Sequence, residues 1–520
     1  MAAGCLAAIA VFIVVAGRLP SAQASDKARE RAVRALREGE FDLAEKLFRE
    51  MLAKNARDKD ARLGLSFTLY KKRMLQDAYD HAARVIAVDP LSARAHALLG
   101  AVVLAAGDFR LSVEEFRTAL TLKDNEALAI AGLAMVDFYE NRSSAAVSGL
   151  QRAAFLDSNE PDYLFNLAQA SARIERYKEA ADAYERFLAI APRTDADRRA
   201  RIRGLIDFLR YLGQQNSLYI VGGANRTEVS FEASDNRPML LVHINNRKEP
   251  LRFVLDTGSG MSVISQETAQ RLGLRPVAQG GAARAIGGGG RFDIYYGFLQ
   301  SMDIGDVRIE NVPIYIRRFF NDKTRVDGYI GLSVISKYLT TVDYGTGILT
   351  LSRQRSASSA ATATEGIELP LRTTSAGFLS GEVQIESIGK PLNFIIDTGA
   401  TVSVVSSLLA EREDLLARFA QNLRMQIYGS AGVADNVKVL MLPKVSLGSY
   451  GREKIYAAVL DMDSINETAG FEQTGIVGGN FLRHFRLIFD FQKNIVRLEP
   501  LVVKPEAETP TRLNIGVGGS

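Results

Sequence analysis

The pattern of hydrophobic and polar positions changes near residue 213 and divides the chain into two parts. Before this point the sequence is rich in alanine and has the apolar spacing of helices. Beyond it, short β-branched and aromatic runs are separated by Gly, Asn and Pro, which is typical of β domains. The pattern predicts a multidomain protein with an N-terminal α-helical part and a C-terminal all-β part.

Small residues in the helical part recur every 34 positions, in two series 12 residues apart. A small side chain on each helix lets the backbones of an antiparallel pair approach closely where they cross. Five such helix pairs are expected, over residues 25–58, 59–92, 93–126, 127–160 and 161–194. The small residues are Ala32, Ser66, Gly100, Ala134 and Ala168 in one series and Ala44, Ala78, Ser112, Ala146 and Ala180 in the other. Bulky residues mark the turn between the paired helices at Phe41, Leu75, Phe109 and Tyr177, and Ser143 breaks this pattern in the fourth repeat.

This 34-residue helix-turn-helix period resembles the tetratricopeptide repeat (TPR). The expected solenoid covers residues 25–213 and ends in a capping helix over 195–212. The resemblance implies a concave surface that binds peptides or a protein partner. A mere spacer is the alternative, since a repeat pattern identifies no ligand.

The β part contains a duplicated segment. Phe253-Val254-Leu255-Asp256-Thr257-Gly258-Ser259 recurs 141 positions later as Phe394-Ile395-Ile396-Asp397-Thr398-Gly399-Ala400. Each copy is an apolar β run that leads a carboxylate into a turn containing glycine. The copies define a first lobe over residues 237–352 and a second over 377–500, with a linker at 353–376 and a disordered polar tail at 501–520. The segment 214–236 is expected to be a linker, with the first strands of the first lobe as the alternative.

A second shared signal closes each lobe. It is Asp327-Gly328-Tyr329-Ile330-Gly331 in the first lobe and Gly475-Ile476-Val477-Gly478 in the second. Paired Asp-Thr-Gly turns, each followed by an apolar pair and Gly, resemble the pepsin and retropepsin group of aspartic proteases. The resemblance implies a bilobal aspartic-protease fold and an aspartic-type endopeptidase acting on a protein or peptide substrate.

Two adjacent carboxyl groups that share one proton supply both a base and an acid, so peptide hydrolysis needs neither a metal nor a nucleophilic side chain. We therefore expect Asp256 and Asp397 to be catalytic. Supporting roles in the two catalytic loops fall to Thr257, Gly258, Ser259, Thr398, Gly399 and Ala400. In the family the two threonines cross-link the loops by hydrogen bonds. Ser259 can donate a hydrogen bond where Ala400 cannot, so Asp256 is expected to ionise more readily.

A glycine-rich run between the first Asp-Thr-Gly turn and its closing motif resembles the family's mobile flap over the substrate. It comprises Ile286, Gly287, Gly288, Gly289 and Gly290, and an ordinary flexible loop is the alternative. Tyr428-Gly429-Ser430-Ala431-Gly432 occupies the corresponding place in the second lobe.

The N-terminal segment 1–24 reads as a signal peptide or a membrane anchor. Its apolar run ends at Pro20, which is expected to break the helix, and Ala22-Gln23-Ala24 fits a signal-peptidase site. Export to the periplasm or the medium is expected, with membrane attachment only if the segment stays uncleaved.

Composition removes several other classes of function. Cys5, in the apolar run, is the only cysteine, which excludes disulfides and thiolate catalysis, and four scattered histidines fit no metal site. No metal or other cofactor is therefore expected, and a net charge of +4 without a basic block argues against nucleic acid. Two alternatives to the protease stay open: a non-catalytic peptide-binding module, and lobes that pair between chains.

Overall fold

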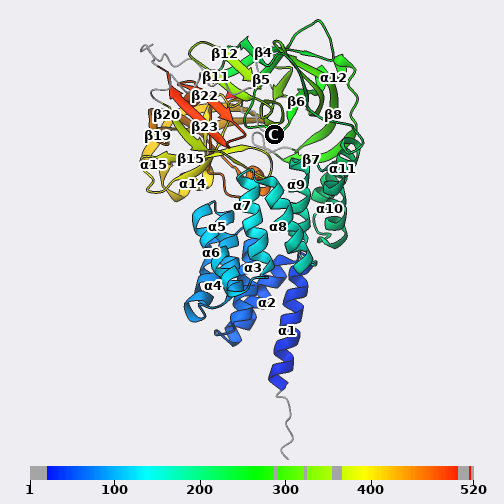
Figure 1. Cartoon of the computed structure of the whole chain (residues 1–520). Coiled ribbons are helices and arrows are strands. Elements are labelled where there is room, and N and C mark those ends of the chain that lie inside the picture. Colours follow the sequence, from blue (N-terminus) through cyan, green and yellow to red (C-terminus); the bar gives the residue numbers. More distant parts are fainter. Residues whose placement is uncertain (1–19, 285–290, 321–324, 354–365, 502–514, 517–520) are drawn as a thin grey trace, which may run out of the picture.

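The computed structural model describes residues 20–284, 291–320, 325–353, 366–501 and 515–516. A helical array forms one end of the molecule, and two β lobes form the other (Figure 1). The apolar run of the N-terminal segment and the expected flap residues Ile286–Gly290 lie outside the described residues. None of the helices in the described ranges combines the length and apolarity that a membrane crossing requires.

The array contains five antiparallel helix pairs and a capping helix. Second helices begin at residues 41, 75, 109, 143 and 177, in the predicted register, and first helices after the first repeat begin at 59, 93, 127 and 161. The small residues of both series are buried at the crossings. The helices are α1 (Pro20–Arg37), α2 (Phe41–Lys54), α3 (Lys59–Lys71), α4 (Leu75–Val88), α5 (Ala93–Ala105), α6 (Phe109–Leu122), α7 (Ala127–Tyr139), α8 (Ser143–Leu156), α9 (Pro161–Arg173), α10 (Tyr177–Ile190) and α11 (Ala196–Leu212).

The structure corrects the expected start of the array. Pro20 begins α1, and the backbone of Ala22–Ala24 is helical, while residues 1–19 lie outside the described part of the chain. A proline is tolerated there because the first turn of a helix has no partner for its N–H groups.

The first lobe is built on a nine-stranded sheet with the order β1-β9-β6-β10-β5-β4-β8-β7, in which β3 pairs with β4. Its strands are β1 (Ile220–Gly223), β3 (Glu232–Ser234), β4 (Arg237–Ile244), β5 (Leu251–Leu255), β6 (Ser262–Ser265), β7 (Ala278–Arg284), β8 (Arg291–Ile304), β9 (Val307–Arg317) and β10 (Gly328–Ile330), with short helices α12 (Gln266–Leu272) and α13 (Leu332–Ile335).

The second lobe repeats this plan in the order β14-β15-β16-β21-β17-β20-β19-β18-β24. Its strands are β14 (Arg372–Thr373), β15 (Leu379–Ile385), β16 (Leu392–Ile396), β17 (Ser403–Ser406), β18 (Ala420–Gly429), β19 (Gly432–Leu447), β20 (Tyr450–Leu460), β21 (Gly475–Val477) and β24 (Ile515–Gly516). Its helices are α14 (Ser407–Arg412), α15 (Leu415–Phe419), α16 (Asp463–Ala469) and α17 (Gly479–Leu482).

A six-stranded sheet takes three strands from each half of the β part and joins the lobes, in the order β13-β23-β22-β11-β12-β2. Its centre is the antiparallel pair β11 and β22, in which Val342 lies opposite Leu487. The strands are β2 (Arg226–Ser230), β11 (Leu339–Asp343), β12 (Ile348–Ser352), β13 (Ile367–Pro370), β22 (Phe485–Asp490) and β23 (Ile495–Pro500). Because both lobes share this sheet, their apolar residues form one continuous core.

Three predicted boundaries are corrected by these strands. Residues 214–236 are not a linker, since β1, β2 and β3 enter two sheets. Residues 367–373 of the second expected linker also form strands, whereas 354–365 lie outside the described residues. In the expected tail, Ile515–Gly516 pair with β18, and the flanking residues 502–514 and 517–520 are not described.

Candidate active site

Each Asp-Thr-Gly turn is held by the closing motif of its own lobe. Strand β10 runs parallel to β5 and antiparallel to β6, and the N–H of Asp256 donates to the carbonyl of Ile330 at 3.0 Å. In the second lobe β21 has the same relation to β16 and β17, and the N–H of Asp397 donates to the carbonyl of Val477 at 3.0 Å. The closing motifs thus pack behind the turns and fix where each carboxyl group points.

The two turns are cross-linked by four reciprocal hydrogen bonds. The hydroxyl of Thr257 donates to the carbonyl of Ile396 at 2.6 Å and accepts from the N–H of Thr398 at 3.1 Å. The hydroxyl of Thr398 donates to the carbonyl of Leu255 at 2.7 Å and accepts from the N–H of Thr257 at 3.2 Å. Both threonines are fully buried, so water does not compete for these bonds.

The cross-link brings the carboxyl groups of Asp256 and Asp397 into direct hydrogen-bonding contact at the junction of the lobes. Their exposed fractions are 2% and 1%. The close approach depends on glycine: a Cβ added to Gly258 would lie 2.5 Å from Cγ of Asp397, and one added to Gly399 would lie 2.7 Å from Cγ of Asp256.

The backbone of each turn also binds its own carboxylate. The N–H of Gly258 donates to Oδ1 of Asp256 at 2.9 Å. Oδ1 of Asp397 accepts from the N–H groups of Gly399, at 2.7 Å, and Ala400, at 3.1 Å.

The two carboxyl groups differ in their affinity for a proton. Burial raises the pKa of both Asp256 and Asp397. For Asp256 the increase is opposed by hydrogen bonds from Asp397 and from the Gly258 N–H, by the charge of Arg317 and, least of all, by the Ser259 hydroxyl. The pKa of Asp397 is raised further because the charge of Asp256 lies beside it. The pair therefore favours a state that holds one proton in common, and the charge of Asp256 favours that proton on Asp397.

Arg317, at the end of β9, is a component of the site that the sequence analysis did not identify. It is 6% exposed, and its guanidinium carbon lies 5.0 Å from the ring centroid of Phe319 and 5.9 Å from that of Phe292. No motif marks this residue, because it reaches Asp256 only through the pairing of β9 with β6.

Hairpins from both lobes meet near the site. Strands β7 and β8 flank the undescribed residues of the expected flap, with Ala283 opposite Phe292. In the second lobe Ser430 and Ala431 form the turn between β18 and β19. Phe292 and Ala431 form one apolar cluster, so the two hairpins contact each other.

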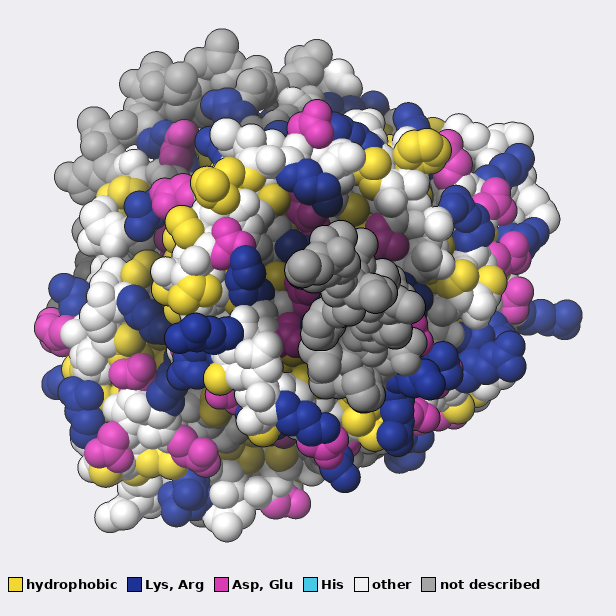
Figure 2. Space-filling view, turned by 90° about the horizontal axis from the view of Figure 1, so that it is seen from below, with side chains coloured by type: hydrophobic (Ala, Val, Ile, Leu, Met, Phe, Trp, Pro, Cys, Tyr) yellow, Lys and Arg dark blue, Asp and Glu magenta, His cyan; other side chains and the backbone are white. Residues whose placement is uncertain are grey.

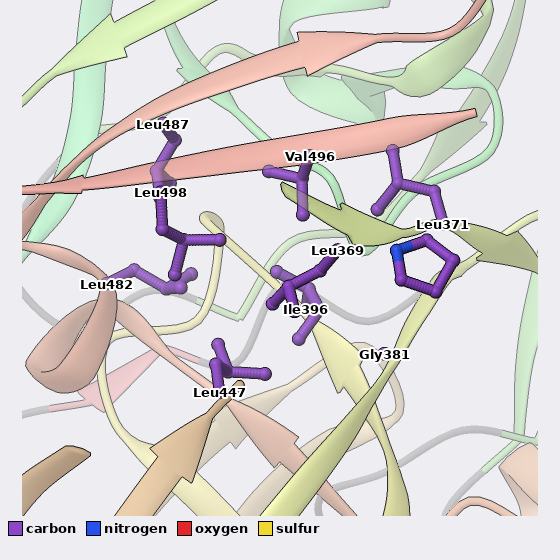
Figure 3. A pocket seen from close by; sticks show the side chains of 10 residues that line it. Leu369, Leu371, Gly381, Ile396, Leu447, Leu482, Leu487, Val496 and Leu498 are labelled. Atoms are coloured by element: carbon purple, nitrogen blue, oxygen red, sulfur yellow. The ribbon is translucent and has the colours of Figure 1, made fainter. Parts of the chain in front are cut away.

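The described residues hold no cluster of His, Cys, Asp and Glu that could bind a metal ion. A small cavity between the six-stranded sheet and the second lobe is lined by Leu369, Ile396, Leu447 and other apolar side chains (Figure 3). Its volume of about 10 Å³ leaves room for one water at most, so it is a packing defect of the core.

Comparisons with known proteins agree with this geometry. An aspartyl protease family model matches residues 241–334 and 382–481, and these two segments begin 141 residues apart. Tetratricopeptide repeat models match residues 35–102 and 161–194. No curated protein matches the chain.

Among solved structures, the chain is similar to an aspartic proteinase from Irpex lacteus, at 14% identity and a TM-score of 0.37, covering 53% of this chain and 98% of that one. It is also similar to a thermophilic TPR protein of Thermus thermophilus, at 21% identity and a TM-score of 0.30, covering 35% of this chain and 98% of that one. The β part of this chain thus matches the aspartyl protease family model in both lobes, and the part before it matches tetratricopeptide repeat models.

Proposed function

We propose that the protein is an aspartic-type endopeptidase that hydrolyses peptide bonds through a water molecule activated by Asp256 and Asp397. The observation that carries the proposal is the pair of buried, touching carboxyl groups, both with a raised pKa and with that of Asp397 raised further. The charged Asp256 and the protonated Asp397 are a base and an acid within reach of one water.

The reaction follows from these two states. Asp256 removes a proton from the water as its oxygen attacks the carbonyl carbon, while Asp397 gives its proton to the carbonyl oxygen. The resulting gem-diol collapses when Asp397 takes back a proton from one hydroxyl and Asp256 delivers its proton to the departing nitrogen. The C–N bond breaks, and both carboxyl groups return to their starting states.

A non-catalytic peptide-binding module remains the second candidate, since such a module would keep the cleft without the chemistry. Two intact aspartates weigh against it. Pairing of lobes between chains is not needed to form the site, because all four threonine hydrogen bonds form within one chain.

The test is turnover of a mixed peptide library by the purified protein at several pH values, beside Asp256→Asn and Asp397→Asn. We expect cleavage by the wild type alone. Equal inertness of all three proteins, with peptide binding retained, would favour the binding module.

Export is part of the proposal. It rests on the apolar run before Pro20 and on the small residues Ala22-Gln23-Ala24. N-terminal sequencing of the protein from fractionated cells checks it: a chain still beginning at Met1 would contradict cleavage, and recovery from the cytoplasm would contradict export.

A further inference from the structure

A large cavity lies between the helical array and the lobes. Its volume is about 1360 Å³, which exceeds the ~300–1,000 Å³ of a typical small-molecule pocket. On one side it is lined largely by the first helices of the repeats. On the other side it is lined by Gly260 and Met261, which directly follow the first Asp-Thr-Gly turn, and by Phe292 of β8. We call this space the chamber. The inner face of the array and residues next to the first Asp-Thr-Gly turn are therefore two walls of one space, although Asp256 and Asp397 themselves do not line it.

The array closes the chamber against the first lobe through α11. This helix packs on β7 so closely that a Cβ on Gly204 would overlap the carbonyl oxygen of Gln279. Arg201 donates to the carbonyl of Ala282 at 3.1 Å, and the rings of Phe208 and Tyr296 stack with their centroids 4.3 Å apart. The strand that leads into the expected flap is thus fixed to the capping helix.

The second lobe is attached to the array by the segment before β21. The ring of Phe471 is inserted between those of Phe109 and Tyr139, at 5.0 Å from each. The N–H of Glu472 donates to the carbonyl of Ala105 at 2.8 Å, and Arg173 donates to the carbonyl of Thr374 at 2.7 Å. Attachment at both lobes makes the array a fixed wall of the chamber (Figure 1).

The array wall has the chemistry of a polypeptide-binding surface. Its apolar part includes Phe67, Met135 and Phe165, and α9 adds Asn166 and Gln169 one helical turn apart. The side-chain carbonyl Oε1 of Gln169 is buried and has no hydrogen-bond partner among the described residues. A buried acceptor without a partner is costly, and the backbone N–H of a bound peptide would satisfy it once the Gln169 side chain turns toward the chamber.

The charges on the wall do not select a strongly acidic or basic ligand. Lys71 is held by Glu160 and Asp162 at 2.7 and 2.6 Å. The outer face of the molecule seen from below, which is not the chamber wall, likewise carries interspersed acidic and basic side chains (Figure 2). The attraction must therefore come from apolar side chains and backbone hydrogen bonds.

We infer that the chamber holds an extended, unfolded polypeptide rich in apolar side chains, part of it on the array wall and the adjoining part in the cleft. The inference rests on the proposed peptidase function and names its substrate class. A folded domain cannot enter, since even a 100-residue domain has a radius of gyration of about 13 Å. The repeat array then selects the chain that is cut, instead of recruiting a separate partner.

The test compares two peptides: a short one limited to a cleavage sequence from the library, and the same peptide extended at either end by a segment rich in Leu and Phe. We expect kcat/KM to be at least about tenfold higher for the extended peptide, a difference of about 1.4 kcal/mol. Gln169→Trp, which narrows the chamber, should remove this advantage and leave cleavage of the short peptide unchanged. Gln151→Trp is the matched control, because Gln151 is exposed on α8 and lies outside the chamber.

Gln169→Ala, which removes the acceptor without adding bulk, covers the case that the tryptophan variant does not fold. Equal kcat/KM for both peptides, or equal effects of the two tryptophan substitutions, overturns the inference and leaves the peptidase function standing. If neither peptide is cleaved, the peptidase function fails. Binding of the labelled extended peptide to the Asp397→Asn protein, measured by fluorescence anisotropy, then decides whether the chamber is a binding site. Binding weakened about tenfold by Gln169→Trp but not by Gln151→Trp then supports the chamber as a binding site. Binding that is absent, or insensitive to residue 169, refutes it.

Discussion

The threonine cross-link between the catalytic loops can be tested with Thr257→Val, which keeps the shape of the side chain and removes its hydroxyl. The substitution leaves two fully buried backbone groups without partners, the carbonyl of Ile396 and the N–H of Thr398. Each unsatisfied buried group costs ~1–3 kcal/mol, and the costs of the two groups add. Because the loops can relax, we expect a value in the lower part of the range for this sum. We expect the local free energy of opening to fall by about 2–4 kcal/mol.

Hydrogen exchange measured by mass spectrometry on peptides covering both Asp-Thr-Gly turns isolates this effect from the helical array. A loss of about 2 kcal/mol corresponds to roughly 30-fold faster exchange. The increase should occur in both turns, because the hydroxyl of Thr257 bonds only to groups of the second lobe. Turnover should also fall, since the carboxyl groups are no longer held in register.

Thr257→Ser is the matched control, because it retains the hydroxyl and loses only a methyl group. If Thr257→Val and Thr257→Ser exchange at the same rate, the hydroxyl bonds do not hold the loops together. The same holds if exchange rises in the first turn alone.

Four further predictions concern the site and its attachment to the array. Gly399→Ala should abolish turnover while the far-UV circular dichroism stays unchanged, because the new Cβ displaces the carboxyl group of Asp256; retained turnover would contradict the close approach. Arg317→Met should move the acid limb of the kcat/KM profile to higher pH than Arg317→Lys does, since loss of the charge raises the pKa of Asp256; coincident profiles would refute this. Asp397→Asn should stabilise the fold at neutral pH, and this gain should vanish in acid. The raised pKa of Asp397 stabilises the folded state fully at pH values below the pKa of the unfolded state, and this stabilisation is lost as the pH rises through the pKa of the folded state. A difference in Tm that does not change with pH would contradict this. Gly204→Val should separate α11 from β7 and make the hairpin strands more sensitive to limited proteolysis, and an unchanged digestion pattern would count against that contact.

Much of the architecture could be predicted from local patterns. A period of 34 residues places the helices because each repeat buries the same face against its neighbours, and the second helices start where the bulky turn residues predicted. The fourth repeat kept this register in spite of Ser143. The duplication likewise predicted two equivalent lobes, because the residues that form each strand and its Asp-Thr-Gly turn are contiguous in the chain.

Other features depend on contacts between distant segments, which no local spacing encodes. Residues 226–230 have the composition of a linker, and they form a strand because they pair with the edge of β12. Arg317 reaches Asp256 through the order of strands in a sheet. Whether Asp256 or Asp397 carries the proton depends on burial and on the charges around each group, so near-identical loops acquire different pKa values.

The sequence by itself thus determined the repeats, the two lobes and the pair of aspartates, because each is specified by residues close together in the chain. The chamber, the shared sheet and the position of the proton were decided by the tertiary structure alone. They arise from surfaces and charges that meet only when segments hundreds of residues apart, such as Ala105 and Glu472, are packed together.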